Sequence, residues 1–166
     1  MKKQKIFLKK RELAKFPFSK STQIKLISLK SKSEEIVGQD LIKHIDSIRI
    51  GKDIFKPEFY TEVATLNTAQ TNELTNVIFN YTYKKKPYSI SAANCYMPRN
   101  AILFLDNNNV IIAYLEFCFS CDGFRTSSKD FGIGEYCSEK YEMIKAIFKE
   151  SEIVYGITET EEQTSR

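Results

Sequence analysis

The sequence predicts a single α+β domain over residues 1–166, with helices packed on an antiparallel sheet built around a central β-hairpin at about 100–119. Three observations lead to this fold class. The length is usual for one domain. Two apolar segments are joined by a run of Asp and Asn residues at 106–109. Helical apolar patterns occur at about 68–82 and 138–151.

The hairpin is predicted from its turn, because Asp and Asn tolerate the left-handed backbone conformations of tight turns. The first strand, at 101–105, is wholly apolar. The second strand, at 110–119, is apolar on one face and turns polar only near the end of the other. A strand that is apolar on both faces is expected inside a sheet, with cover on each side.

The turn also predicts which residues face each other across the hairpin. A loop at 106–109 sets the register of both strands. This register places Arg99 opposite Glu116 and brings Cys95 diagonally near Cys118. The Arg99–Glu116 pair has two interpretations, a binding or catalytic pair at the rim of the sheet or a structural cross-strand ion pair.

The two helices that cover the sheet are predicted from apolar spacing and from residues typical of helix ends. In 68–82 the apolar residues recur at i, i+3, i+4 and i+7, and Asn67 or Thr68 can cap the N-terminus. In 138–151, Ser138 is the expected cap.

The remaining segments have weaker patterns. Residues 1–20 are expected to form a basic N-terminal arm or short helix, and residues 156–166 a polar, frayed tail. Between them we expect a strand at 22–30, a helix at 39–48, a loop at 51–58, a short strand at 88–92 and a Gly- and Ser-rich connection at 120–134.

The net charge of +4 is unevenly distributed. Residues 1–33 carry eleven Lys and Arg against one acid, a net charge of +10, which leaves −6 for the rest of the chain. Such an arm can bind nucleic acid, an anionic surface or an acidic protein, or it can be a solvated face. A second basic cluster, Lys84, Lys85 and Lys86, is a candidate anion site, although cations at a helix C-terminus are also stabilised by the helix dipole.

The chain has no pattern of a secreted or membrane-spanning protein. Its basic start is followed by only three consecutive apolar residues, whereas a signal peptide needs roughly 7–15. No apolar run approaches the ~20 residues of a membrane span. We therefore expect a cytoplasmic protein without a membrane partner, whose cysteines are reduced, metal-bound or redox-active rather than paired for structure.

The four cysteines are the candidate metal ligands. Cys118 and Cys121 form a C-x-x-C motif, and Cys95 and Cys137 can complete a tetrahedral zinc site. Against zinc, only one C-x-x-C is present, and a regular strand would send Cys118 and Cys121 to opposite faces. A disulfide or redox pair and four inert packing residues are the alternatives.

A motif of a hydrolase or a phosphate-binding enzyme is not found. His44 is the single histidine, and G-x-S-x-G does not occur. A lone histidine is more often a surface or packing residue. The sequence therefore favours a protein that is not an enzyme.

One resemblance joins the two cysteine-bearing segments. The residues Cys95-Tyr-Met-Pro-Arg99, the hairpin, and Glu116-Phe-Cys-Phe-Ser-Cys121 resemble a C-Y-x-P-R, hairpin, E-x-C-F-x-C pattern of small bacterial proteins whose activity is not assigned. The likeness covers about half of the chain and implies no activity or site residues.

The functional expectation is a bacterial binding protein that acts through a protein partner, as immunity proteins and antitoxins do. It depends on the split charge and on the missing catalytic motifs. The alternatives are a cysteine site for zinc or redox chemistry, and nucleic-acid binding through the basic arm. Nucleic-acid binding of this kind would weaken steeply with salt.

Overall fold

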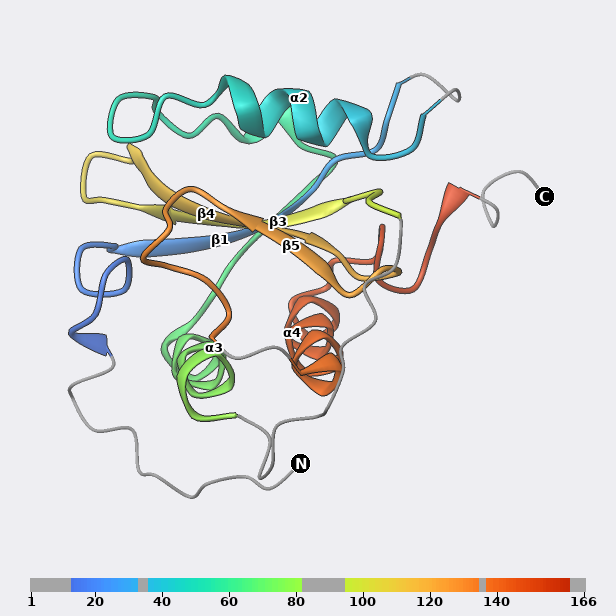
Figure 1. Cartoon of the computed structure of the whole chain (residues 1–166). Helices are drawn as coiled ribbons and strands as arrows, with labels where there is room; N and C mark the ends of the chain where they lie inside the picture. The colour runs from blue at the N-terminus through green and yellow to red at the C-terminus, as the bar shows by residue number, and fades with distance from the viewer. Residues whose placement is uncertain (1–12, 33–35, 82–94, 135–136, 162–166) are drawn as a thin grey trace.

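The structure is a computed structural model that describes residues 13–32, 36–81, 95–134 and 137–161. In these residues the chain forms one antiparallel sheet with helices on both faces, which confirms the predicted α+β class (Figure 1). In spatial order the strands are β2 (Glu62–Thr65), β1 (Gln23–Ser28), β3 (Asn100–Leu105), β4 (Ile111–Cys118) and β5 (Gly123–Thr126). The helices are α2 (Gln39–Ser47), the short 3₁₀ helix η1 (Pro57–Phe59), α3 (Thr68–Asn80) and α4 (Ser138–Glu150).

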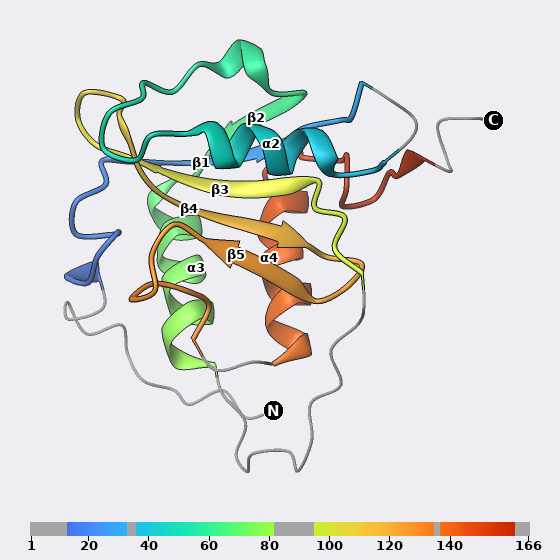
Figure 2. The ribbon, with the colours of Figure 1, turned by 45° about the horizontal axis from the view of Figure 1, so that its top comes forward.

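Two apolar cores lie on opposite faces of the sheet. Helix α2 covers one face, where Leu41 and Ile45 pack against side chains of β1, β3 and β4. Helices α3 and α4 lie side by side on the other face, whose core is larger (Figure 2). Strand β3 is buried along its whole length because it lies in the middle of the sheet and is covered on both sides.

The predicted hairpin forms the centre of the sheet, with β3 and β4 as its strands. Its turn uses the expected chemistry. The Asp106 side chain accepts hydrogen bonds from the main-chain amides of Asn108 and Val110, at 2.8 and 3.0 Å. Asn109 adopts a left-handed conformation with φ 61°, which Asn tolerates better than most residues.

The register of this hairpin differs from the predicted one, so the predicted Arg99–Glu116 pair is wrong. Glu116 lies opposite Ala101 in β3, two positions from where the turn alone would place it. One of the two extra residues is Val110, whose carbonyl accepts the Asp106 amide and closes a longer loop. The other is Ile112, which the pairing of β3 with β4 skips at a bulge.

The predicted helix at 39–48 is confirmed as α2, and those at 68–82 and 138–151 as α3 and α4. Asn67 caps α3 through a capping box, in which its side chain and that of Gln70 each accept the other residue's main-chain amide. For α4 the expected cap is wrong. Cys137 occupies the cap position, and Ser138 is the first helical residue.

Two strands that the sequence did not predict form the edges of the sheet. β2 follows η1 and pairs with β1, and β5 lies within the stretch expected to be a Gly- and Ser-rich connection. Both are only four residues long. The predicted strand at 88–92, Lys84 to Lys86 and residues 1–12 of the basic arm lie outside the described residues.

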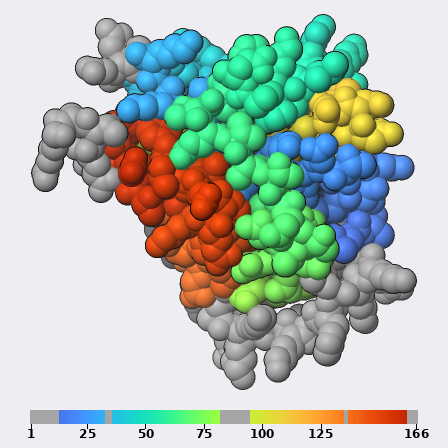
Figure 3. All heavy atoms as spheres, turned by 180° about the vertical axis from the view of Figure 1, so that it is seen from behind, coloured from blue at the N-terminus to red at the C-terminus, as the bar shows by residue number. Residues whose placement is uncertain are grey.

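The C-terminal segment was expected to be frayed from residue 156, and for residues 156–161 this is wrong. Ile157 is buried in the larger core. The Glu62 side chain accepts the main-chain amides of Val154 and Tyr155 at 3.0 and 3.1 Å. Figure 3 shows this segment beside the chain around β2. Gly156, at φ 76°, passes so close to β3 that a Cβ there would lie 2.7 Å from the Cβ of Arg99.

Among the described residues, every helix is too short or too polar to cross a bilayer.

Candidate functional site

The candidate site lies where β4 ends and turns into β5. The strand stops at Cys118, and the amide of Cys121 donates to the carbonyl of Cys118 at 3.3 Å to close a tight turn. A regular strand would have placed these two side chains on opposite faces. Because the strand ends at the first cysteine, the turn brings both sulfur atoms to the same place.

The segment before β3 brings a third sulfur to this turn. The amide of Met97 donates to the sulfur of Cys118 at 3.3 Å. The sulfur atoms of Cys95, Cys118 and Cys121 all lie within 4.8 Å of one another. The predicted approach of Cys95 to Cys118 is therefore confirmed, although the register from which it was derived was wrong. We call these three residues the thiol centre.

Within the thiol centre, Cys95 and Cys121 form a disulfide, with their Cα atoms 6.0 Å apart. Cys118 keeps its thiol and is fully buried. The Ser120 hydroxyl lies 3.4 Å from the Cys118 sulfur and 3.7 Å from the Cys121 sulfur, within hydrogen-bonding reach of both. Of the two residues in the disulfide, Cys95 is exposed and Cys121 is buried.

Cys137, the fourth cysteine, does not belong to the thiol centre. It lies at the start of α4 and is buried there. The predicted set of four ligands is thereby reduced to three that share one position.

A buried ion pair adjoins the thiol centre. Glu116 is two residues before Cys118 and has no exposed surface. The guanidinium of Arg125 donates to both of its carboxylate oxygens, at 2.6 and 3.0 Å, and the Tyr96 hydroxyl donates to one of them at 2.7 Å. A further bond of 3.0 Å joins Arg125 to Asp46 on α2. The carboxylate of Glu116 thus accepts three hydrogen bonds from two other segments.

Both donors to Glu116 have raised pKa values. The hydrogen bond to Glu116 is the main cause that raises the pKa of Arg125, against the opposing effect of burial. Burial, followed by the hydrogen bond to the Glu116 carboxylate, raises the pKa of Tyr96. At neutral pH the Tyr96 hydroxyl therefore stays protonated and donates to Glu116.

Arg99 lies away from this cluster and binds the C-terminal segment. It forms an ion pair of 2.7 Å with Glu161, and Tyr155 also donates a hydrogen bond to the Glu161 carboxylate. The two candidate binding residues Arg99 and Glu116 are thus both paired, but with different partners.

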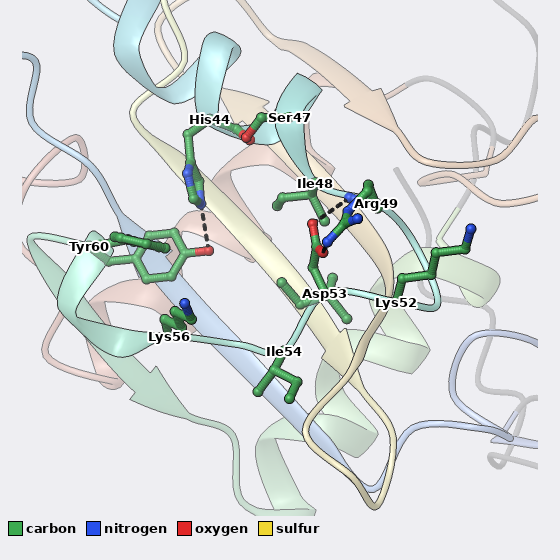
Figure 4. A pocket seen from close by; sticks show the side chains of 11 residues that line it. His44, Ser47, Ile48, Arg49, Lys52, Asp53, Ile54, Lys56 and Tyr60 are labelled. Atoms are coloured by element: carbon green, nitrogen blue, oxygen red, sulfur yellow. Dashed lines mark hydrogen bonds and ion pairs between the residues drawn. The ribbon is translucent and has the colours of Figure 1, made fainter.

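A pocket of about 520 Å³ opens beside the C-terminal end of α2 (Figure 4). His44 and Tyr60 point toward each other on its wall, with 2.9 Å between the imidazole Nε2 and the phenol oxygen. Burial lowers the pKa of His44 and raises that of Tyr60. The pocket combines exposed apolar side chains, Ile54 and Phe59, with charged groups on the loop that follows α2.

Sequence reasoning missed Tyr96, Arg125, Asp46 and Tyr60. Tyr96 had a signal, since it adjoins Cys95 in the pattern that linked the two segments. Arg125 had no such signal, because β5 is too short to show the alternation of polar and apolar residues that predicts a strand. The candidate anion site Lys84 to Lys86 lies outside the described residues, so it stays a prediction.

Comparison with protein-family models, with curated proteins and with solved structures finds no match to this chain.

Proposed function

We propose that the protein is a thiol–disulfide redox protein, which acts by reversible oxidation of Cys95 and Cys121. One observation carries this proposal. The thiol of Cys118 lies within 4.8 Å of both sulfurs of a disulfide that is exposed on one side. A thiol beside a disulfide is a nucleophile that can exchange with it, and a disulfide that serves only to hold two segments together has no use for one.

The chemistry balances with thiols as the reductant. An external thiolate attacks the sulfur of Cys95, the exposed residue of the pair, forms a mixed disulfide there and releases Cys121, which takes up a proton. A second external thiolate then attacks the external sulfur of the mixed disulfide. The two external thiols leave as one disulfide, Cys95 is released and takes up a proton, and the protein has gained two thiols. Cys118 can exchange with either partner in the same way, with its proton passing to the sulfur that leaves.

The expected cytoplasmic location also favours a reversible disulfide. In a reducing compartment a permanent disulfide is rare, and those that form are usually transient and serve catalysis or redox sensing. In the oxidised state two of the four cysteines are in the disulfide, which leaves two thiols.

The test is a redox titration of the whole chain. The protein is equilibrated in mixtures of reduced and oxidised glutathione, quenched, alkylated in denaturant and analysed by peptide mass mapping. Cys95 and Cys121 should pass together from protected to alkylated while the circular dichroism of the fold persists. Cys137→Ser is the matched control and should titrate like the wild type. A disulfide that opens only after the fold is lost would make the bond structural and reject the proposal.

A second candidate function is docking of an acidic protein partner on the loop that follows α2. The observation that favours it is the exposure of Ile54 (59%) and Phe59 (52%) around the pocket. Its lining includes three cations, Arg49, Lys52 and Lys56, against one carboxylate, Asp53. Apolar surface rimmed by charge is typical of protein interaction sites, and the excess of cations fits an acidic partner, as in the expected immunity or antitoxin class.

This second candidate is tested with three baits in an extract of the native host. They are the wild type, the double variant Phe59→Ala with Lys56→Glu, and the control Val154→Ala, whose side chain is also exposed but does not line the pocket. An acidic protein should bind the wild type and the control, be lost from the double variant, and, when purified, bind less tightly as salt rises. Equal capture by all three baits would reject this surface. Nucleic-acid binding by the basic arm stays a prediction from the sequence.

A further inference from the structure

The number of free sulfurs in the thiol centre depends on its oxidation state. Its three sulfurs come from two segments, residues 95–97 and the turn 118–121, which meet in space although 20 residues separate them in the chain. In the oxidised state two of the sulfurs are bonded to each other and cannot donate to a metal. Reduction frees these two, so that all three sulfurs can then donate to a metal.

The spacing of the sulfurs fits one zinc ion. With Zn–S bonds of about 2.3 Å in a tetrahedron, the sulfur atoms lie about 3.8 Å apart. The three sulfurs already lie within 4.8 Å of one another, and one of them belongs to an exposed residue whose side chain can adjust. Only small side-chain rotations are then needed once the Cys95–Cys121 bond is open.

Hydrogen-bonding groups surround the sulfurs of the thiol centre. The Met97 amide donates to the Cys118 sulfur at 3.3 Å, and the Ser120 hydroxyl lies within reach of Cys118 and Cys121. Such outer hydrogen bonds orient metal ligands and support their negative charge. A donor set made of thiolates selects soft or borderline metals, of which zinc needs no redox change of its own.

We infer that the reduced thiol centre binds one Zn²⁺ through Cys95, Cys118 and Cys121, and that formation of the Cys95–Cys121 disulfide expels it. Three protein ligands leave the fourth position to water or to an exogenous thiol, which is the arrangement of zinc sites that exchange ligands. This inference rests on the proposed redox function for its release step, whereas the binding step requires only the reduced protein.

The release step balances with an organic disulfide as the oxidant. Two zinc-bound thiolates, those of Cys95 and Cys121, give up one electron each and join. The oxidant takes up the two electrons and two protons and leaves as two thiols. Cys118 takes up a third proton when it loses the metal, and Zn²⁺ passes to water.

The binding step is tested with Co²⁺ as a spectroscopic probe and with Zn²⁺ as its competitor. The full chain is reduced with a phosphine, freed of metal and titrated without oxygen. We expect one Co²⁺ per chain, with the thiolate-to-cobalt charge-transfer and ligand-field bands of a tetrahedral sulfur site, and displacement by one Zn²⁺. Reduced protein with four alkylatable thiols that gives neither band overturns the inference and leaves the redox proposal standing.

Matched variants separate metal binding from redox chemistry. Cys118→Ser keeps the pair Cys95 and Cys121, so it should still cycle with glutathione but should bind metal more weakly by more than the roughly 10–100-fold that loss of an outer-shell partner brings. Cys137→Ser should bind metal as the wild type does. If Cys118→Ser does not fold, Cys95→Ser tests the same loss of one ligand. Wild-type affinity in either ligand variant would overturn the inference.

Release is measured by adding oxidised glutathione to the zinc-loaded protein beside a chromophoric chelator. One equivalent of zinc should appear in step with protection of Cys95 and Cys121 from alkylation. Disulfide formation with zinc retained would overturn the expulsion, and a thiol centre that binds zinc but never oxidises would overturn the redox proposal instead.

Discussion

Glu116 shows how a single buried acid is held in this fold. Its carboxylate accepts three hydrogen bonds from Arg125 and Tyr96 and has no exposed surface. An ionised group in such a place is costly unless donors satisfy it, so the side chain and its partners depend on one another. Cys118 lies two residues after Glu116 in β4, so the hydrogen bonds from Arg125 and Tyr96 also fix the end of the strand that carries the thiol centre.

The first prediction concerns this acid. Glu116→Gln should lower the free energy of unfolding by about 1.5–3 kcal/mol, because it replaces charge-assisted hydrogen bonds and leaves the Arg125 guanidinium without its main counter-charge. Urea unfolding followed by circular dichroism measures it. Asp53→Asn, which breaks the exposed i,i+4 pair with Arg49, is the control and should change stability much less. Equal effects of the two substitutions would contradict the role given to Glu116.

Glu161 ties the C-terminal segment to the sheet and makes stability depend on acid. Burial alone would raise its pKa, but hydrogen bonds from Arg99 and Tyr155 outweigh that effect and lower the pKa from 4.5 to about 2. A carboxyl group whose folded pKa is depressed stabilises the fold above its unfolded pKa, and this stabilisation is lost as the pH falls.

The second prediction is a pH window. As the pH falls from about 4.5 to about 2, the free energy of unfolding of the wild type should decrease by more than that of the Glu161→Gln variant, which lacks the titrating carboxyl group. The difference should be of the order of 1 kcal/mol, because the Glu161 side chain is 29% exposed and partly screened by solvent. Urea midpoints at several pH values measure it. Parallel curves for the wild type and the variant across the window would refute it.

At the scale of elements, helices α3 and α4 are determined by local patterns, and their ends by short-range hydrogen bonds. The Asn67–Gln70 capping box satisfies two main-chain amides at the N-terminus of α3. The start of α4 lacks a side-chain cap bond at Cys137. The two helices thus begin in chemically different ways, although both pack on the same core.

The third prediction follows from the cap of α3. Asn67→Ala should cost about 1 kcal/mol of stability, because the Gln70 amide loses its acceptor. Asn107→Ala, an exposed change of the same kind in the hairpin turn, is the control and should stay within about 0.5 kcal/mol. Thermal unfolding of the two variants gives the comparison, and a control that destabilises as much as Asn67→Ala would contradict the cap.

At the scale of the whole molecule, one buried lysine connects parts that the sheet does not join. Lys140 is 1% exposed, lies on α4 and donates to the carbonyl of Ile78 near the end of α3 and to that of Ile133 in the preceding loop, at 3.1 and 2.6 Å. The ammonium group therefore links three segments.

The fourth prediction tests that link. Lys140→Met keeps the length of the side chain but removes its donors, and it should lower the free energy of unfolding by about 2 kcal/mol or more. Lys149→Met, on the exposed last turn of the same helix, should cost less than about 1 kcal/mol. Denaturant unfolding with both variants decides between them. A stable Lys140→Met protein would show that the carbonyls find other donors.

The sequence by itself determined the α+β class, the central hairpin and the helices α2, α3 and α4, because apolar periodicity, caps and turn residues are local signals. Only the tertiary structure decided the partner of Glu116 and the members of the thiol centre. A longer loop and one bulged residue, Ile112, moved the register of β3 and β4 by two, so that Glu116 faces Ala101 instead of Arg99. The charged partner of Glu116 is Arg125, which faces it from β5, a strand too short to show alternation, on the other side of β4. Contacts between segments far apart in the chain depend on such small offsets, which no local pattern records.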